Sequence, residues 1–567
     1  MQLKQKLTIF SMMIGIFLCM LDTTVMNIAL PAIQRGLNVN LGTLSWALNS
    51  YTIIFAVFTI PFGRLADMIG RNKVYLTGLL LFFLGSLLSG SASQAVGLII
   101  GRVIQSLGAA IIFPASMTIG ISSTDIKHRT GVLAALGVTQ GVASAFGPTI
   151  GGIVTQYLGW RYVFLINLPL TLVALILCWR LLPLKGEKRF NAKIDALGML
   201  SSMVMLFSLT LALVKGNDWG WSSLVTINLL TISAISLLGF IIVERLTSDP
   251  MVPLDLFKNR QFTGASLTTI VTEIFLVAIL VIMPTFFTNL LNKSELTAAL
   301  MITPASVMIF IFSPIGGFLN AKLGPRLLVS SGFLQIIIGY LILSNANLNH
   351  YLPVVISFLL IGGGFGIIAG PLVVLGAANF TGKLLSASQS VLGVFRQIGT
   401  LLAVAIFVSG LTTNLTAARR RSVIQANTQI ETTQLPRQTK MTLRSTSRVA
   451  IMNHDQPTND HQQQGMTPAK TQQLIRVTYR RALTSIPNAT HLSPTKKALI
   501  HTKVAKMVKQ RVANQNRQLK PMINQIESTT RKNMTNAFQK GYQMAFPFTL
   551  LAIGISLLFE KKRRYPR

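Results

Sequence analysis

The sequence predicts an all-α polytopic membrane protein, and three observations support this fold class. Of the 567 residues, 51% are apolar and only 12% are charged, whereas charged residues make up about 25% of an ordinary soluble protein. Apolar runs of roughly twenty residues recur along the whole chain, and each is long enough to cross a ~30 Å hydrocarbon core as a helix. Strands of a membrane barrel would be about ten residues long and would alternate apolar with polar residues, which these runs do not do. Helices of this length satisfy their own backbone groups in lipid.

We predict fourteen spans from these runs. The first run follows Lys4 and Lys6, as in a signal peptide, but it continues to Leu30 without a small-residue cleavage site. We therefore expect it to be retained as the first span. The spans are expected near residues 8–30, 45–62, 74–92, 97–120, 131–155, 163–183, 195–214, 224–243, 264–288, 297–319, 327–346, 352–378, 386–410 and 543–559.

Lysine and arginine are concentrated in alternate connections between the spans. With the N-terminus inside, the inner segments hold most of these residues, including the terminal run Lys561–Arg564. The short outer loops hold little beyond Arg35, Arg161, Lys215 and Lys293. The positive-inside rule then places both termini in the cytoplasm, which requires an even number of spans and favours fourteen over thirteen.

A charged segment bounded by glycines occurs twice. Gly63 to Lys73 follows the second predicted span, and Gly317 to Arg326 follows the tenth with the same spacing of seven between its glycines. Ala321 stands where the first copy has Asp67. We expect a polar turn between two spans in each place. Such a repeated hinge indicates a membrane protein built by duplication, whose halves move against each other.

The segment at about 411–541, between the last two predicted spans, differs from the rest of the chain. It is polar, carries about +18 of the total net charge of +35, and falls on the outer side of the predicted topology. Residues 472–481 and 496–520 favour helix, but apolar residues are too few for a sizeable core. It is either a mobile, solvated loop with some helix or a segment attracted to anionic wall polymers or lipid headgroups. No nucleic-acid partner is expected, because aromatic residues hardly interleave with the basic ones.

Two carboxyl groups inside the spans are candidate functional residues, because ionisable groups in the membrane are costly. Asp22 lies in the first span and Glu273 in the ninth. Removal from water disfavours the charged form, so a buried acid can hold a proton and release it when water or a cation arrives. Alternatively, Asp22 is a carboxylate with a role in helix packing only. The alternative for Glu273 is a residue near the membrane surface that faces water.

Arg102, early in the fourth span, is the third candidate. It is followed by Gln105 and Gly108 at three-residue spacing, which places them on one helix face. A buried guanidinium must be paired, so Arg102 could hold Asp22 ionised; a purely structural role is the alternative. For Arg396 and Gln397 in the thirteenth span we favour a structural role.

The fifth span is rich in small residues. Residues at four-residue spacing let helices pack closely, and a proline between them kinks the helix. Tight packing alone would explain the glycines, but Gly-Pro-x-x-Gly-Gly places a kink and a close contact together near the expected interface between halves. The motif consists of Gly137, Gly141, Gly147, Pro148, Gly151 and Gly152.

No cofactor, metal or enzymatic activity is expected. Cys19 and Cys178 both lie inside apolar runs, and no metal-ligand spacing occurs. A phosphate-binding Gly-x-x-x-x-Gly-Lys-Ser/Thr loop is absent from the sequence, so ATP is not expected as the direct energy source.

Together these motifs resemble the major facilitator superfamily, and specifically its fourteen-span drug:proton antiporters of the EmrB/QacA type. The resemblance extends over the chain outside the segment at 411–541. It rests on Gly63–Lys73, on Arg102–Gly108 with Ser106 where Gly is usual, on the fifth-span motif Gly137–Gly152, on Leu21–Pro31, on Trp160–Pro169, and on Asp195–Trp221 for an extra pair of spans.

The resemblance implies the major facilitator fold, with two six-helix bundles and two extra transmembrane helices. We therefore expect an N-terminal bundle at 1–190, two linker spans at 191–250, and a C-terminal bundle at 251–567 that the extracellular segment at 411–541 interrupts.

It also implies roles for single residues. Gly63, Arg64, Asp67, Gly70 and Arg71 would form a conformational latch at the cytoplasmic ends of the spans. Arg102 would take part in proton coupling, and Asp22 would be the proton or cation site, open to a central cavity. Glu273 matches no fixed position of the family, and we expect it among the cavity acids that face cationic compounds.

The implied function is proton-coupled multidrug efflux by alternating access, in the cell membrane of a bacterium. The expected partners are small lipophilic, cationic substrates, protons and membrane lipid. One alternative is an exporter of a specific metabolite or lipid-like molecule. A nutrient importer, which the fifth-span motif argues against, and a non-transporting sensor or anchor are the others.

Overall fold

The computed structural model describes residues 2–39, 41–185, 187, 195–377, 380–433, 437–452, 468–486 and 493–560, and within these ranges the regular elements are all helices. The chain forms two compact units. The membrane unit comprises Met1–Thr288, Lys293–Leu411 and Gln539–Arg567, and the basic unit comprises Asn289–Asn292 and Thr412–Phe538. The predicted C-terminal run Lys561–Arg564 lies outside the described residues.

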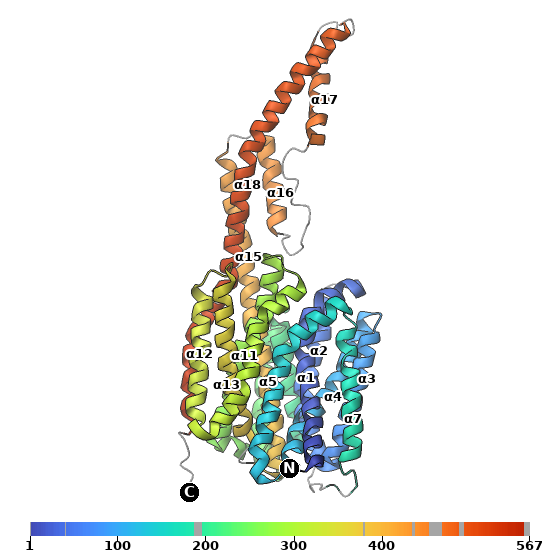
Figure 1. Ribbon diagram of the computed structural model, residues 1–567, viewed down its shortest axis with the longest axis vertical. Helices are drawn as coiled ribbons and strands as arrows, with labels where there is room; N and C mark the ends of the chain where they lie inside the picture. Colours follow the sequence, from blue (N-terminus) through green and yellow to red (C-terminus); the bar gives the residue numbers. More distant parts are fainter. Residues whose placement is uncertain are drawn as a thin grey trace. The chain divides into compact units, whose positions relative to one another are not determined.

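The membrane unit is a bundle of helices (Figure 1). They are α1 (Leu3–Leu37), α2 (Leu41–Ile69), α3 (Arg71–Ser91), α4 (Ala95–Ser122), α5 (Ile126–Tyr157), α6 (Tyr162–Leu165), α7 (Asn167–Leu181), α8 (Ala196–Trp219), α9 (Leu224–Leu246), α10 (Arg260–Thr285), α11 (Glu295–Leu323), α12 (Pro325–Asn345), α13 (Tyr351–Ala377), α14 (Gly382–Ala403) and the end of α18 (Pro494–Ala552). Short π-helical turns follow α10 at Phe286–Leu290 and α14 at Val404–Val408, where α15 (Ser409–Glu431) begins.

The fourteen predicted spans agree with the structure. Thirteen helices in the described part of the chain are long and apolar enough to cross a membrane, and the bent α5 makes fourteen when its two arms count as one span. Each predicted range overlaps one of these helices, because run length is a property of the local sequence.

The same helix pairings occur twice in the membrane unit. In the first six spans α1 packs on α5, and both α2 and α3 pack on α4; in the later set α10 packs on α14, and both α11 and α12 pack on α13. The two sets meet along α5 with α11 and along α2 with α14. By these pairings α5 corresponds to α14 and α11 to α2, so the two contacts are equivalent and a pseudo-twofold relation connects the sets. We call them the N-terminal and C-terminal halves.

Each copy of the repeated hinge contains a glycine with a positive φ angle. Gly70, between α2 and α3, has φ +128°, and Gly324, between α11 and α12, has φ +83°. Glycine adopts these angles without the steric penalty of a Cβ atom. The turn predicted over Gly63–Lys73 is longer than the observed one, however. The helix continues to Ile69 and resumes at Arg71, because the residues from Arg64 to Ile69 include no helix breaker.

Helix α5 bends by 45° between its arms Gly131–Ser144 and Phe146–Tyr157. Pro148 lacks a backbone N–H, and its ring crowds the carbonyl four residues earlier, at Ser144. The kink therefore lies where the predicted Gly-Pro motif places it.

The extra helices α8 and α9 pack on each other, and α8 also contacts α2 and α14, one helix from each half. Asp195 caps α8 by accepting a hydrogen bond from the Gly198 amide. The proposed domain boundary at residues 190 and 191 lies outside the described residues.

The basic unit is more helical than the expected loop. It contains most of α15, α16 (Arg437–Met452), α17 (Pro468–Thr484) and most of α18. The helices predicted at 472–481 and 496–520 are confirmed. Three small apolar clusters in its described residues stand in place of a large core. In the first, Ile475 of α17 packs with Val504, Val508 and Val512 of α18. In the second, α18 packs on α15 and α16 around Ile430, Ile451 and Leu519. The third joins Ala418 of α15 to Met534 and Ala537 of α18.

Candidate functional site

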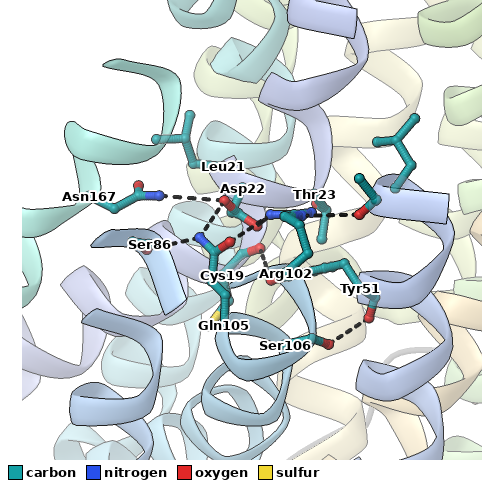
Figure 2. A network of polar contacts seen from close by, with 12 residues as sticks. Cys19, Leu21, Asp22, Thr23, Tyr51, Ser86, Arg102, Gln105, Ser106 and Asn167 are labelled. Atoms are coloured by element: carbon teal, nitrogen blue, oxygen red, sulfur yellow. Dashed lines mark hydrogen bonds and ion pairs between the residues drawn. The ribbon is translucent and has the colours of Figure 1, made fainter. Parts of the chain in front are cut away.

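Asp22 and Arg102 form a buried ion pair inside the N-terminal half. The Nη1 atom of Arg102 lies 2.5 Å from Oδ2 of Asp22, and each residue is only 1% exposed. The side-chain amide of Gln105 donates to Oδ1 of Asp22 at 2.8 Å, and that of Asn167 donates to the same atom at 3.4 Å. Figure 2 shows side chains from α4 and α7 converging on the Asp22 carboxylate of α1.

Further contacts hold the two polar side chains of α4 in place. Gln105 accepts from Nη1 of Arg102 at 2.8 Å and donates to Ser86 of α3 at 2.9 Å (Figure 2). The guanidinium of Arg102 also donates from Nε to the Ala47 carbonyl at 3.3 Å and lies 4.1 Å from the ring centroid of Tyr51. Because both charges are desolvated, the pair depends on these additional hydrogen bonds.

A cavity of about 50 Å³ lies between the halves, with space for only a few water molecules. Its wall comes from α1 and α5 of the N-terminal half and α10 and α14 of the C-terminal half, which are corresponding helices of the repeat. Seven of the fourteen residues of the wall are apolar. The polar groups on it are Thr23, Thr24, Ser144, Glu273, Arg396, Gln397 and Thr400.

Glu273 and Arg396 form the charged pair of this cavity. Nε of Arg396 lies 2.9 Å from Oε1 of Glu273, with the two side chains 16% and 8% exposed. Both belong to the C-terminal half, but Nη1 of Arg396 also donates to Oε1 of Gln140 in α5 at 2.5 Å. The same nitrogen lies 3.5 Å from the sulfur of Met20 in α1. Arg396 therefore connects the cavity acid to two helices of the opposite half.

Asp22 does not line the cavity in this conformation, contrary to the expectation from the sequence. Its neighbours Thr23 and Thr24 do, while Asp22 points to the other side of α1, into the N-terminal half. Successive helical residues point about 100° apart, so one helix carries the cavity wall and the buried pair on different faces. Only the thickness of α1 separates the two sites.

Arg396 and Gln140 are site residues that the sequence analysis missed or set aside. Arg396 was interpreted as structural, and Gln140 was not selected. The available signal was an arginine in the middle of an apolar run, which is as unusual in the membrane as Arg102. Glu273 lies in another helix, so no local pattern indicated their pairing.

The glycines of α5 allow close approach of helices from both halves. A Cβ atom at Gly147 would overlap the Thr24 hydroxyl of α1, and one at Gly151 would lie 2.8 Å from the Val25 carbonyl oxygen. On the C-terminal side, a Cβ at Gly137 would lie 2.8 Å from Val373 of α13. At Gly141 and Gly152 the nearest atoms belong to Ile309 and Ala299 of α11, at 3.1 and 3.0 Å. The fifth-span motif thus lies between α1 and the C-terminal half.

The first hinge contacts the start of α14 across the two halves. Asp67, which is 3% exposed, accepts from Nε of Arg71 at 2.7 Å and from the Ser386 hydroxyl at 2.8 Å. Arg71 also donates to the Gly382 carbonyl at 2.9 Å. A carboxylate near the N-terminus of α14 complements the helix dipole. At Gly63 a Cβ atom would overlap the Ser390 hydroxyl of α14.

Arg64 has a different partner from the other hinge residues. It donates to the backbone carbonyl of Asp249 at 2.9 Å and lies 3.9 Å from its carboxylate. Lys383 of α14 forms an ion pair with the same carboxylate at 3.0 Å. Asp249, in the segment after α9, was not selected from the sequence. It connects the extra helices to both halves beside the hinge.

The fold and these sites define a class of protein: a polytopic transporter made of two related helix bundles around a central cavity. A family model described as Major Facilitator Superfamily matches residues 12–404. The chain therefore belongs to the major facilitator superfamily, a family of transporters and not of enzymes.

Several curated relatives carry names that refer to drug resistance. The multidrug transporter protein MdtP of Bacillus subtilis is 32% identical over 70% of this chain and 74% of its own length. The multidrug resistance protein Stp of Mycobacterium tuberculosis is 29% identical over 73% of this chain and 77% of its own. The puromycin resistance protein of Streptomyces alboniger is 30% identical over 71% and 80%.

Proposed function

We propose that this protein exports lipophilic, cationic compounds in exchange for protons, by alternating access of the central cavity. The observation that carries the proposal is the cavity between corresponding helices of the two halves, where the acid Glu273 lies among apolar side chains of α1, α5 and α10. Apolar side chains around one carboxylate suit a compound that is both lipophilic and positively charged. The names of the relatives support drugs as the substrate class.

The size of the cavity supports a moving mechanism. A space of about 50 Å³ cannot hold a drug molecule, so the halves must separate before substrate enters. The wall is divided between the halves along α1 with α5 and α10 with α14. Rocking of one half against the other would therefore open the cavity to one side at a time.

Substrate binding at Glu273 would change the partner of Arg396. A cationic group that reaches the carboxylate competes with the guanidinium 2.9 Å away. Arg396 keeps its second contact with Gln140 in the other half. When substrate replaces Arg396 at Glu273, the contact of Arg396 with Gln140 in the other half changes as well. Substrate binding is thereby coupled to movement of the halves.

The proton would act at Asp22. Protonation from outside removes the charge that Arg102 needs, so the buried pair loosens and α1 can shift. Met20, Thr23 and Thr24 on the other face of α1 line the cavity, so this shift would lead to release of the drug. Deprotonation to the inside restores the pair and prepares the cavity for the next substrate.

The energetics restrict what drives the exchange. Proton entry supplies about 2.3 kcal/mol per 100 mV and about 1.4 kcal/mol per pH unit. With both terms, one proton would hold roughly a 500-fold gradient of a neutral solute. One-for-one exchange with a monovalent cation moves no net charge, so the pH gradient alone would drive it.

The protein is a multi-pass membrane protein, and we propose that both termini are cytoplasmic. We further propose that an N-terminal bundle (1–190), a linker pair (191–250) and a C-terminal bundle (251–567) are its working parts, surrounded by membrane lipid. For the segment at 411–541 we propose an anionic polymer of the cell surface as the partner.

Efflux of a lipophilic cationic dye from intact cells tests this function. We expect efflux to stop when a protonophore collapses the proton gradient, and cells that carry the protein to resist several unrelated cationic dyes. Resistance to a single compound would favour the alternative of an exporter for one metabolite or lipid-like molecule. Efflux that continues at full rate with the protonophore would contradict proton exchange.

A further inference from the structure

The basic unit presents a regular row of positive charges on α18. Lys503, Lys506 and Lys509 lie three residues apart, Arg517 follows eight residues later, Lys520 three residues after that, and all five are exposed. At about 100° per residue they share the helix face opposite the apolar seam of Val504, Val508, Val512 and Leu519. We call these five residues the cationic stripe. With a rise of 1.5 Å per residue, it is about 26 Å long.

The stripe belongs to a hairpin of α17 and residues 494–520 of α18, and the next acid along α18 is Glu527, seven residues after Lys520. Residues 468–520 include twelve lysines and arginines and neither aspartate nor glutamate. Arg476, Arg480 and Arg481 add exposed cations on α17. Like charges on one helix face repel one another. Together they create a strong positive field, which a polyanion would neutralise.

The apolar seam is already covered, which argues against insertion into a lipid surface. A helix that lies in a membrane interface presents its own apolar face to the acyl chains. In α18 that face packs on Ile475 of α17 and on Ile430 and Ile451 of α15 and α16. On residues 494–520 of α18 the exposed large apolar side chains are Leu499 and Met507, eight residues apart among the cations, so charge is the main feature that a partner would bind.

The hairpin offers little for stacking of nucleic-acid bases. Tyr479 is the single aromatic residue besides histidine in residues 468–520, and its ring centroid lies 5.0 Å from that of His501. No aromatic platform for stacking of bases is left. Charges arranged in a line, and not around a pocket, fit repeated phosphates along a chain better than one free phosphate.

We propose that the cationic stripe binds a linear phosphodiester polymer on the outer surface of the cell. This inference rests on the proposed orientation, in which the segment between the last two spans lies outside. Binding would be multivalent, so it should weaken steeply with salt as counterions are released. The polymer would hold the transporter within the cell envelope without taking part in the transport step.

Binding of lipid-free poly(glycerol phosphate) to the full-length protein in zwitterionic nanodiscs tests the stripe. We expect binding that weakens with salt, and at least about tenfold weaker binding when all five stripe residues are changed to Gln. A matched variant changes five exposed cations of the basic unit outside the stripe to Gln, at Arg420, Arg421, Arg437, Arg448 and Lys532. It should retain most of the affinity.

Equal loss in both variants would show that net charge, and not the stripe, attracts the polymer, and would overturn the proposal. Absence of polymer binding, or tighter binding of anionic vesicles or duplex DNA at equal phosphate concentration, would overturn it as well. Circular dichroism verifies that both variants keep their helix. Dye efflux should stay at the rate of the unchanged protein in the stripe variant, which separates this proposal from the transport function.

A cysteine in place of the exposed Gln473 tests the orientation separately. The native cysteines Cys19 and Cys178 are buried, so an impermeant maleimide should react only with the new thiol. We expect labelling of intact cells. Labelling that requires lysed cells would place the hairpin inside and exclude a cell-surface partner, whatever the result of the binding assay.

Discussion

At the scale of single residues, the two candidate acids of the spans lie in different surroundings: Asp22 is buried with Arg102 in one half, while Glu273 faces the cavity. Changing Asp22 to Asn would leave the Arg102 charge buried without its counter-ion. Loss of one partner of a buried pair costs about 3–5 kcal/mol. We expect Asp22→Asn to lower the thermal stability of the purified protein, and Asp22→Asn/Arg102→Gln to recover part of it. A single variant as stable as the original would contradict the importance of the pair.

The same substitution has a predicted effect on transport. Asparagine cannot exchange a proton at this position, so Asp22→Asn should abolish proton-coupled efflux while the protein remains inserted. Efflux in inverted vesicles and the amount of protein in the membrane measure the two effects. Full efflux by the variant would remove Asp22 from the mechanism.

Glu273→Gln should affect cationic substrates selectively. The substitution leaves the Arg396 charge in the cavity wall without its carboxylate, so the cavity repels a cation. We expect efflux of monovalent cationic dyes to fall at least about tenfold, with a smaller effect on uncharged lipophilic compounds. An equal loss for both classes would indicate a structural role for Glu273.

The candidate residues could be selected from the sequence, but their surroundings could not. A charge inside an apolar run is visible in one dimension, which is why Asp22, Arg102 and Glu273 stood out. The side of α1 that faces the cavity depends on packing with α5 and α10, and a shift of one residue exchanges Asp22 for Thr23. The pairing of Arg396 with Glu273 and Gln140 joins three helices that are distant in the chain.

At the scale of elements, α5 is the helix on which both halves depend. Its glycines contact α1 on one side and α11 and α13 on the other, and its kink follows from Pro148. These features were predictable because small residues and proline act on the local backbone. The extent of α2 was not: glycine at position 63 suggested a turn, but there it serves close packing against Ser390.

Two glycines of α5 provide a matched comparison. A Cβ atom at Gly147 would overlap Thr24, whereas one at Gly131 would meet nothing within 4 Å. We expect Gly147→Ala to reduce efflux and thermal stability by forcing α1 and α5 apart, at a cost of about 1–3 kcal/mol. Gly131→Ala should be neutral or slightly stabilising. Similar losses in both variants would show that helix flexibility, and not the contact with α1, is what the glycines provide.

At the scale of the whole molecule, contacts beside the first hinge hold the two halves together. Asp67 and Arg71 bind the start of α14, and Asp249 joins Arg64 to Lys383. The second hinge has Ala321 in place of the acid, so the latch is asymmetric although the fold is repeated. The repeat could be recognised in the sequence; the contribution of Asp249 and the linker helices could not, because it arises only when three segments meet.

Breaking the latch should slow the transport cycle without preventing substrate binding. We expect Asp67→Asn and Arg71→Ala to lower the rate of dye efflux, with dye affinity of the purified protein within about twofold of the original. Lys73→Ala, an exposed neighbour in α3, serves as the control and should leave the rate unchanged. Unchanged turnover in the two latch variants would refute the latch.

The most direct test of proton-coupled exchange is the movement of protons in proteoliposomes when a monovalent cationic dye is added. The account predicts that dye flux and proton flux run in opposite directions, depend on the pH gradient and not on the membrane potential, and are both lost with Asp22→Asn. Dye transport without proton movement, or at the same rate without a pH gradient, would contradict it.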